Sequence, residues 1–376
     1  MGAARFAGAN AFQAGRLWTV CGTASGLTAA KLLVYAVLAG GGLGEALCQS
    51  DCNWYVSVAA DGYDAAPHLV TGQWQANWAF FPLYPLLIRG LDALTGSAPR
   101  AAGVAISTVC FIAFAVLGAR YRQVTRGEDS PWMWLLLLTA WPYGLYFHVV
   151  YSEALYAALA TAGLLALARA RPLAAGCASA LLTATRPTGI LLAGWICGEQ
   201  LVRASSARPA SRAAAILLPA VIAPAGLLAF MAFLYLAVRD PLAFAHIQSG
   251  WQHTARNPVA VLRDAFATVA MQPLRAGPWY LAAWPVLGLA AAIWLLATRR
   301  FAEAWLCGMT VLVALASGTL WSMPRFVAAN PAFLLAIADL LTAIRWRILR
   351  VAMLLAMAVV QVVFVLAWYR GARFLI

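Results

Sequence analysis

The chain has 376 residues, of which 64% are hydrophobic and 10% are charged. Soluble domains carry roughly a quarter charged residues. This composition, with a mean hydropathy of +0.79, indicates a polytopic helical membrane protein and leaves no room for a large soluble domain. The net charge of +13 would suggest nucleic acid in a soluble protein. Arginines at the ends of membrane spans explain it here, and we expect no nucleic-acid partner.

The fold class that we expect is an all-α integral membrane protein, with residues 1–376 forming a single polytopic domain. The polar N-terminal segment is short and leads into a long apolar run, so this run is expected to be a retained first span and not a cleaved signal. About eleven spans are predicted: 17–40, 100–119, 131–150, 153–170, 172–186, 188–203, 213–238, 278–298, 301–320, 327–343 and 348–368.

Arginines cluster in every second connection between these spans, as the positive-inside rule expects of cytoplasmic loops. The alternation predicts a cytoplasmic N-terminus and an extracytoplasmic C-terminus, although Arg370 and Arg373 then lie outside. The cytoplasmic clusters are Arg5 and Arg16; Arg120, Arg122 and Arg126; Arg169 and Arg171; Arg203, Arg208 and Arg212; Arg299 and Arg300; and Arg345, Arg347 and Arg350.

The hydrophobic segment 79–94 resembles a further span, but a crossing there would move every later arginine cluster to the outside. It also contains Pro82, Pro85 and Arg89, which suit an isolated crossing poorly. We therefore expect a helix that lies in the outer interface or re-enters shallowly, with aromatic residues at headgroup depth.

Two long connections then lie on the extracytoplasmic side, a first loop over 41–99 and a second over 239–277. Short basic connections lie on the cytoplasmic side. The sequence therefore favours a function on the extracytoplasmic side, with the first loop as the catalytic loop. Eight of the thirteen acids fall on the outer face: Glu45, Asp51, Asp61, Asp64, Asp92, Glu153, Asp240 and Asp264.

Asp51 precedes the segment 53–60, whose pattern NWYVSVAA predicts a short amphipathic helix that ends at Gly62. Its carboxylate could cap this helix by accepting backbone N–H bonds, or act as a general base toward an acceptor hydroxyl. Asp61 and Asp64 flank a Gly-Tyr turn and are interpreted as turn residues. Cys48 and Cys52 could form a disulfide in an oxidising compartment, but their spacing does not require one.

The aromatic run Asn77-Trp-Ala-Phe-Phe-Pro-Leu-Tyr-Pro85 has two interpretations. It is either an anchor at the membrane interface or one wall of a groove for a lipid chain or sugar ring. Periodicity does not separate the two.

Several motifs together resemble the PIG-V family of GPI mannosyltransferases and its bacterial homologues. In the first loop these are Asp51-x-x-Trp54-Tyr55, Gly62-Tyr63 and the run AFFPLYPL that contains Tyr84. Further motifs extend the resemblance over most of the chain: Tyr151-Ser152-Glu153, Thr185-Arg186-Pro187-Thr188-Gly189, Gln248 with Trp251 and Pro258, and Pro324-Arg325-Phe326. The chain departs from the family at Ser50, where a tryptophan is expected, and at Phe326, where a tyrosine is expected.

The resemblance implies a multi-span glycosyltransferase of the GT-C type that uses a lipid-linked sugar. The reaction would be an inverting transfer of a hexose, typically mannose, from a polyprenyl-phosphate donor to an acceptor hydroxyl outside the cytoplasm. Asp51 aligns with the first-loop aspartate that such enzymes use as base. The resemblance also suggests contacts with the acceptor or sugar for Trp54, Tyr55, Tyr63, Tyr84, Gln248 and Trp251.

A departing lipid phosphate carries negative charge, which fixed cations should meet. Arg186 and Arg325 lie at the outer ends of spans and are candidates for this role, although arginines there can also extend to headgroups. Glu153 could orient the acceptor or pair with Arg186, because an ionised carboxylate at that depth needs a partner.

No spacing of the four histidines, His68, His148, His246 and His253, suggests a metal site, and the only cosubstrate expected is the lipid-linked sugar. The expected partners are membrane lipids, this donor and an unidentified glycolipid, glycan or protein acceptor. The expected location is a bacterial cytoplasmic membrane, with the active site facing the periplasm or exterior. Alternatives are a transporter or flippase of a lipid-linked sugar, or a non-enzymatic assembly scaffold. Against transport, the distinctive charges lie in loops and at span ends and not at the bilayer midplane.

Overall fold

The computed structural model describes residues 2–205 and 210–375, and over these the chain is almost entirely helical. One cytoplasmic arginine predicted above, Arg208, lies outside the described residues. A two-stranded antiparallel hairpin pairs β1 with β2, His68 opposite Gln75. The all-α prediction is therefore confirmed.

The first half of the chain contains α1 (Gly2–Ala39), α2 (Leu43–Ala46), α3 (Asp51–Asp61), β1 (His68–Val70), β2 (Gln73–Gln75), η1 (Asn77–Ala79), α4 (Leu83–Thr95), α5 (Pro99–Arg126), α6 (Trp132–Ala140), η2 (Gly144–Phe147), α7 (Glu153–Ala168), α8 (Pro172–Thr183), η3 (Pro187–Gly189) and α9 (Ile190–Ser205). The second half contains α10 (Ala210–Ile222), α11 (Ala225–Val238), α12 (Ala243–His246), η4 (Ile247–Trp251), α13 (Pro258–Met271), α14 (Ala276–Ala297), α15 (Phe301–Ala316), α16 (Met323–Ala328), α17 (Pro331–Ala343), α18 (Arg347–Tyr369) and η5 (Arg373–Leu375).

Four described helices are long and apolar enough to cross a membrane, namely α1 from Leu17, α5, α14 and α18. A fifth candidate is the pair α10–α11, which bends by 42° at its break. Shorter apolar helices, among them α7, α8, α15 and α17, pack between the long ones. By length and composition the chain is thus a helical membrane protein.

Three predicted spans are interrupted, and a proline lies at each break. The span 131–150 is helical only to Ala140, because Trp141 precedes Pro142 and takes an extended conformation. The span 213–238 breaks before Pro224, and the span 327–343 breaks at Asn330 before Pro331. Continuous helices were wrong at these places because hydrophobicity alone does not register where a backbone N–H is missing.

Within the segment 79–94, the helix α4 begins at Leu83 and continues to Thr95, and Gly96 ends it in the left-handed conformation. Leu86 and Leu87 are exposed on one side of this helix, while Tyr84 and Ile88 are buried on the other. Its 13 residues would span only about 20 Å at 1.5 Å per residue. This length is short of a bilayer crossing by α4 alone. The helices α8 and α17, with 12 and 13 residues, lie in predicted spans, so the interfacial placement of α4 remains a prediction from the arginine pattern.

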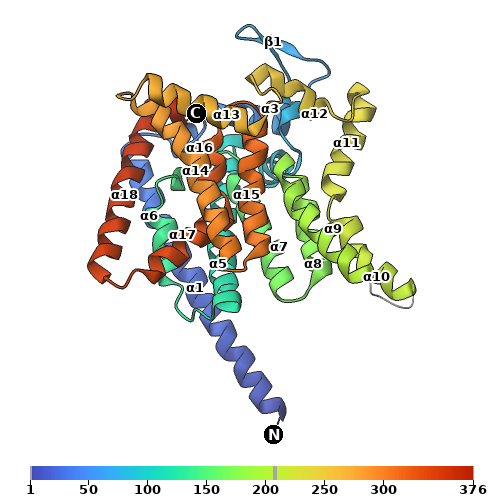
Figure 1. Cartoon of the computed structure of the whole chain (residues 1–376), viewed down its shortest axis with the longest axis vertical. Helices are drawn as coiled ribbons and strands as arrows, with labels where there is room; N and C mark the ends of the chain where they lie inside the picture. Colours follow the sequence, from blue (N-terminus) through green and yellow to red (C-terminus); the bar gives the residue numbers. More distant parts are fainter. Residues whose placement is uncertain (1, 206–209, 376) are drawn as a thin grey trace.

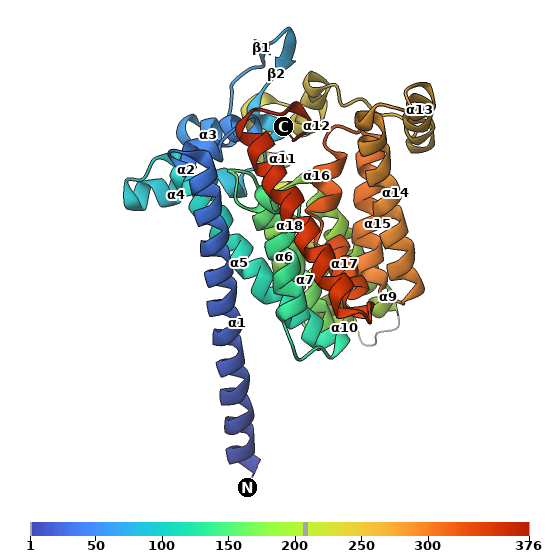
Figure 2. The same cartoon turned by 90° about the vertical axis from the view of Figure 1, so that its left-hand side faces the viewer.

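The centre of the bundle is α7, which packs most extensively against α5. Figure 1 places α3, α12, α13, α16 and the β1–β2 hairpin at one end of the bundle, here called the hairpin end. Figure 2 confirms this placement in the perpendicular view. The connections α5–α6, α7–α8 and α17–α18 lie at the opposite end.

Buried ion pairs hold the opposite end together. Arg122, 1% exposed in its side chain, pairs with Asp339 at 2.5 Å and donates to Glu128 at 2.9 Å. Arg126 pairs with the same Asp339 and with Glu303, both at 2.7 Å. These contacts join α5 to α15 and α17, so two arginines of the predicted cytoplasmic clusters are internal structural groups.

Candidate functional site

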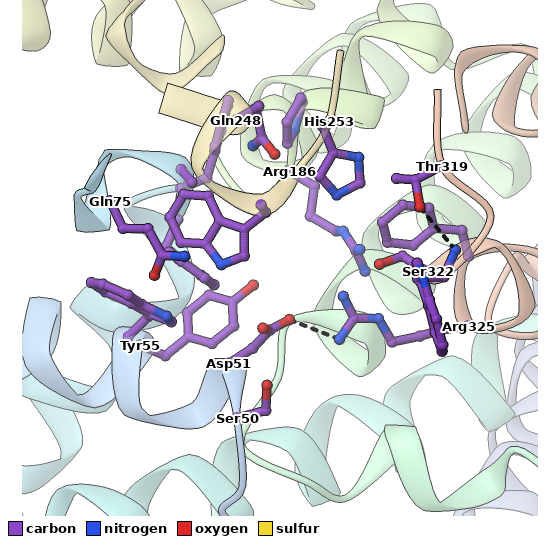
Figure 3. A pocket seen from close by; sticks show the side chains of 18 of the residues that line it. Ser50, Asp51, Tyr55, Gln75, Arg186, Gln248, His253, Thr319, Ser322 and Arg325 are labelled. Carbon is purple, nitrogen blue, oxygen red and sulfur yellow. Dashed lines mark hydrogen bonds and ion pairs between the residues drawn. The ribbon is translucent and has the colours of Figure 1, made fainter. Parts of the chain in front are cut away.

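A cavity of about 460 Å³ opens at the hairpin end of the bundle. Segments far apart in the sequence meet around it: the start of α3, the hairpin, the turn before η3, the chain around η4, and the link from α15 to α16 (Figure 3). The residues that line it are Ser50, Asp51, Trp54, Tyr55, Gln75, Ala79, Phe80, Phe81, Thr185, Arg186, Pro187, Gln248, Trp251, His253, Thr319, Trp321, Ser322, Arg325 and Phe326.

Asp51 is the first residue of α3, and its carboxylate points into the cavity (Figure 3). It accepts a hydrogen bond from Nη1 of Arg325 at 2.8 Å. Ser50 occupies the N-cap position and makes no side-chain capping bond. The Asp51 carboxylate is thus paired with a cation in the cavity. Within the described residues it accepts no bond from a backbone N–H of α3.

The backbone around Asp51 is tightly constrained. Cys48 and Cys52 form a disulfide that encloses it, and Cys52 is fully buried. Between them Ser50 has φ +49°, a conformation unfavourable for a residue with a side chain. Such strain persists only where the surroundings enforce it, and here the disulfide and the buried cysteine do so.

Glu153 connects two arginines beneath the cavity. Its Oε1 atom lies 2.9 Å from Nη1 of Arg186 and 3.3 Å from Nε of Arg325. The Glu153 side chain is 2% exposed, whereas each arginine is 14% exposed. With Asp51, two carboxylates and two guanidiniums form a charge-balanced cluster, here called the ion-pair cluster. Its arginines face the cavity and Glu153 anchors them from below.

Aromatic rings support both guanidiniums. Arg186 lies over the Phe326 ring at 4.9 Å, and Arg325 lies over Tyr151 at 5.0 Å. Desolvation alone would lower the pKa of Arg325, but Asp51 and then Glu153 raise it well above its ordinary value. The guanidinium therefore stays charged. Phe326 replaces the tyrosine that the resemblance predicts, and its ring supplies a cation–π face without a hydroxyl.

One wall of the cavity is aromatic. Trp54 stacks on Phe80 at 5.8 Å between ring centroids and meets Trp251 edge-on at 5.6 Å. Tyr55 packs against Phe80, and its hydroxyl bonds Ser152 at 2.8 Å. Trp54, Tyr55 and Trp251, for which the resemblance suggests contacts, thus line the cavity, and this wall offers ring faces for stacking.

Neutral polar groups complete the lining. The Nε2 of Gln75 donates to the carbonyl of Gly250 at 2.8 Å, which joins the hairpin to η4. Nδ1 of His253 lies 3.1 Å from the Ser317 hydroxyl. Burial, and then the nearby Arg325, lower the pKa of His253 against an opposing effect of Asp51. With Gln248 at the same edge, these groups can hydrogen-bond to hydroxyls without adding charge.

Tyr63 and Tyr84, two predicted contact residues, lie outside the cavity lining. The Tyr63 hydroxyl donates to the carbonyl of Phe80 at 2.7 Å, and its ring packs on Phe230 and Phe233. Tyr84 is fully buried, and its hydroxyl donates to the carbonyl of Gly103 at 3.0 Å. Both are therefore packing residues that fix the aromatic run in place.

Asp64, interpreted as a turn residue, also bonds to a second segment of the first loop. Its carboxylate accepts from the backbone N–H of Asn77 at 2.7 Å, and the Asn77 side-chain oxygen accepts from the Asp64 N–H at 2.9 Å. This reciprocal pair fastens the loop after α3 to η1. Asp61 is exposed at the far end of α3.

Reasoning from the sequence missed several residues of the lining, above all Gln75, His253, Thr319, Ser322 and Trp321. None belongs to a motif with recognisable spacing. Their positions depend on how the hairpin and the α15–α16 link fold over the cavity. Local sequence patterns do not predict this tertiary arrangement. Within residues 2–205 and 210–375, no three His, Cys, Asp or Glu side chains are grouped to hold a metal ion.

No protein-family model matches the chain, and no curated protein matches it significantly. The site offers one carboxylate facing two guanidiniums across an aromatic, largely uncharged cavity. Such a set of groups can bind an anion at one side and remove a proton at the other.

Proposed function

We propose that the protein is an inverting glycosyltransferase that moves a hexose from a polyprenyl-phosphate donor to an acceptor hydroxyl on the extracytoplasmic side. One observation carries the proposal. Asp51 and Arg325 meet at 2.8 Å in one cavity together with Arg186. The motif resemblance assigns the carboxylate to the base and the arginines to the phosphate. Mannose is the hexose that the resemblance implies.

In this reaction the acceptor oxygen attacks the anomeric carbon while Asp51 takes the hydroxyl proton. The bond from the anomeric carbon to the phosphate oxygen breaks, and the lipid phosphate leaves with the electron pair. Arg325 and Arg186 stabilise its negative charge, because charge-assisted bonds from guanidinium to phosphate are strong and directional. Trp54 and Trp251 hold the sugar face, and Gln75, Gln248 and His253 bond its hydroxyls.

The ion pair between Asp51 and Arg325 has a consequence for this scheme. One carboxylate oxygen of Asp51 accepts the bond from Arg325, so the pair must open before that oxygen can take the proton of the acceptor hydroxyl. A donor phosphate competes for Arg325 and thereby releases Asp51. Glu153 remains beneath both arginines and keeps them oriented. The base is therefore activated when the donor binds.

We place the chain in a bacterial cytoplasmic membrane with about eleven spans, the N-terminus inside and the cavity outside. The helices α7, α9 and α15 have 16 residues each, or about 24 Å, against a hydrocarbon core of about 30 Å. Each would cross together with adjoining turns that are buried in protein, where irregular backbone is tolerated. Membrane lipids and a glycolipid, glycan or protein acceptor are its partners.

Asp51→Asn tests the assignment of the base. Because the amide cannot accept the proton, transfer should fall by at least about 100-fold. Donor binding should persist or tighten, since Arg325 loses its competing carboxylate. The measurements are transfer rate and donor affinity on the purified protein. Asp61→Asn, at the other end of the same helix, is the matched control and should be active. Normal turnover by Asp51→Asn would remove Asp51 as base.

The transporter or flippase alternative makes a different prediction for the same variant. If the cluster only guided a lipid-linked sugar through the protein, Asp51→Asn would alter movement of that lipid across a bilayer and no transfer would occur in any variant. The non-enzymatic scaffold predicts no change in glycolipid or glycoprotein profiles.

A further inference from the structure

Another hollow lies where α5 ends and the chain turns from α7 into α8. Figure 1 places these segments at the end of the bundle opposite the hairpin end. The hollow encloses about 520 Å³ and is lined by Arg120, Gln123, Val124, Arg169 and Arg171. We call it the basic hollow. It belongs to neither the ion-pair cluster nor the reaction proposed above.

Three guanidinium-bearing residues converge there without an acid. Arg120 donates to the side-chain oxygen of Gln123 at 2.6 Å. Within the described residues, no carboxylate pairs with Arg120, Arg169 or Arg171. Arg122, two residues along α5 from Arg120, instead pairs with Asp339 at 2.5 Å. The arginines inside the bundle are thus paired with acids, whereas, among the described residues, no acid lines the hollow itself; Glu128 and Asp129 line a neighbouring pocket that also includes Arg120 and Gln123.

The turn that carries two of these arginines is held in a defined shape. Ala170, between Arg169 and Arg171, has φ +53°, a conformation that side chains other than glycine's disfavour. The N–H of Arg171 donates to the carbonyl of Ala166 at 2.8 Å, and that of Arg169 to the carbonyl of Leu165 at 3.1 Å. Both arginines therefore lie in a hydrogen-bonded turn at the C-terminal end of α7.

We propose that the basic hollow binds a phosphate group. Three arginines gathered around one hollow favour an anionic ligand, and the planar fork of a guanidinium matches phosphate oxygens in pairs. Val124, 42% exposed, borders the hollow on its apolar side. The shared chemistry is an anionic phosphate, supplied by a phospholipid headgroup or by a soluble phosphate compound. The positive-inside tendency alone requires only charge at this end, not convergence on a hollow.

The test compares two triple variants of the full chain. Arg120→Gln/Arg169→Gln/Arg171→Gln removes the basic hollow. Arg345→Gln/Arg347→Gln/Arg350→Gln removes the same charge from the α17–α18 connection at the same end (Figure 1) and leaves the hollow intact. Retention of phosphatidylglycerol is measured by native mass spectrometry, and binding of inorganic phosphate is measured by thermal shift.

The wild type and the α17–α18 variant should bind phosphate or phosphatidylglycerol equally, and the hollow variant should bind at least about tenfold more weakly. Binding of phosphatidylglycerol alone identifies a lipid headgroup site, and binding of both probes identifies a site for phosphate itself. Equal loss in both variants would overturn the proposal in favour of net charge alone. No binding of either probe by the wild type would also overturn it. Glycosyl transfer is not read in this experiment, so its outcome is independent of the proposed function.

Discussion

At the scale of single residues, Glu153 orients the two arginines of the site although it does not itself line the cavity. It is 2% exposed and pairs with two arginines. A buried ion pair adds little compared with apolar packing, but removing one partner leaves an uncompensated charge and costs about 3–5 kcal/mol. Glu153 therefore sets the position of Arg186 and Arg325 more than it adds to net stability.

Glu153→Gln should consequently lower the thermal unfolding midpoint, because Arg186 and Arg325 lose the carboxylate that pairs with both. Glu153→Gln/Arg186→Gln removes one of these cations and should recover part of the lost stability. Thermal unfolding in detergent checks both variants. A double variant that is less stable than Glu153→Gln by the full effect of Arg186→Gln alone would show that the two side chains are not coupled.

The sequence identified the charged residues of the site but not their pairing. Asp51, Arg186 and Arg325 were each singled out, and all three line the cavity. Nothing in the sequence indicated that Asp51 and Arg325, separated by 274 positions, bond to one another. Tyr63 and Tyr84, two further predicted contacts, lie outside the cavity lining. Each belongs to a matching motif, yet motif membership does not tell a substrate contact from a packing residue whose hydroxyl is satisfied by a backbone carbonyl.

At the scale of elements, α3 and its disulfide position the base. The Cys48–Cys52 link has a sequence separation of only 4, so loop closure accounts for about 2 kcal/mol at most in a chain-entropy model. Its larger effect is local, because it holds Ser50 at φ +49° immediately before Asp51. The prediction from sequence left this disulfide open, and the structure pairs the two cysteines.

Cys48→Ser/Cys52→Ser should therefore reduce the turnover number by about tenfold or more while donor affinity changes little, because Arg325 and Glu153 stay in place. Treatment of the wild type with dithiothreitol should reproduce this effect if the bond is accessible to reductant, and the double variant should be insensitive to it. Steady-state kinetics separates the two parameters. A loss confined to donor affinity would contradict a role in positioning Asp51.

The helix breaks show which features of the elements the hydrophobic pattern does not predict. Hydrophobic runs predicted α14, α15 and α18 to within a few residues. They failed at Pro142, Pro224 and Pro331, where a run continues in composition although the helix does not continue in geometry. The break near Pro142 matters for the site, because the irregular chain after α6 leads directly into Ser152 and Glu153.

At the scale of the whole molecule, the two ends of the bundle differ in the charged groups that they carry. The ion-pair cluster and cavity lie at the hairpin end, and the arginine-rich connections lie at the other (Figure 1). The alternation of arginines therefore corresponds to a real separation in space. Broken and short helices lie between the long ones.

Cysteine labelling tests the orientation. Thr71→Cys places a thiol in the turn of the hairpin, and Ser130→Cys places one in the α5–α6 connection, both exposed. In a background in which the other free cysteines are replaced by alanine, an impermeant maleimide should label Thr71→Cys in intact spheroplasts. It should label Ser130→Cys only after permeabilisation. The reverse pattern would invert the topology and place the cavity in the cytoplasm.

The most direct measurement of the central claim uses purified protein in proteoliposomes with a polyprenyl-phosphate mannose labelled in the sugar and a membrane extract as the source of acceptor. The proposed function predicts that label moves from the lipid phosphate to a new product, that free polyprenyl phosphate appears in equal amount, and that Asp51→Asn abolishes both. Labelled lipid that crosses the bilayer with its sugar still attached, with no product formed, would contradict the account.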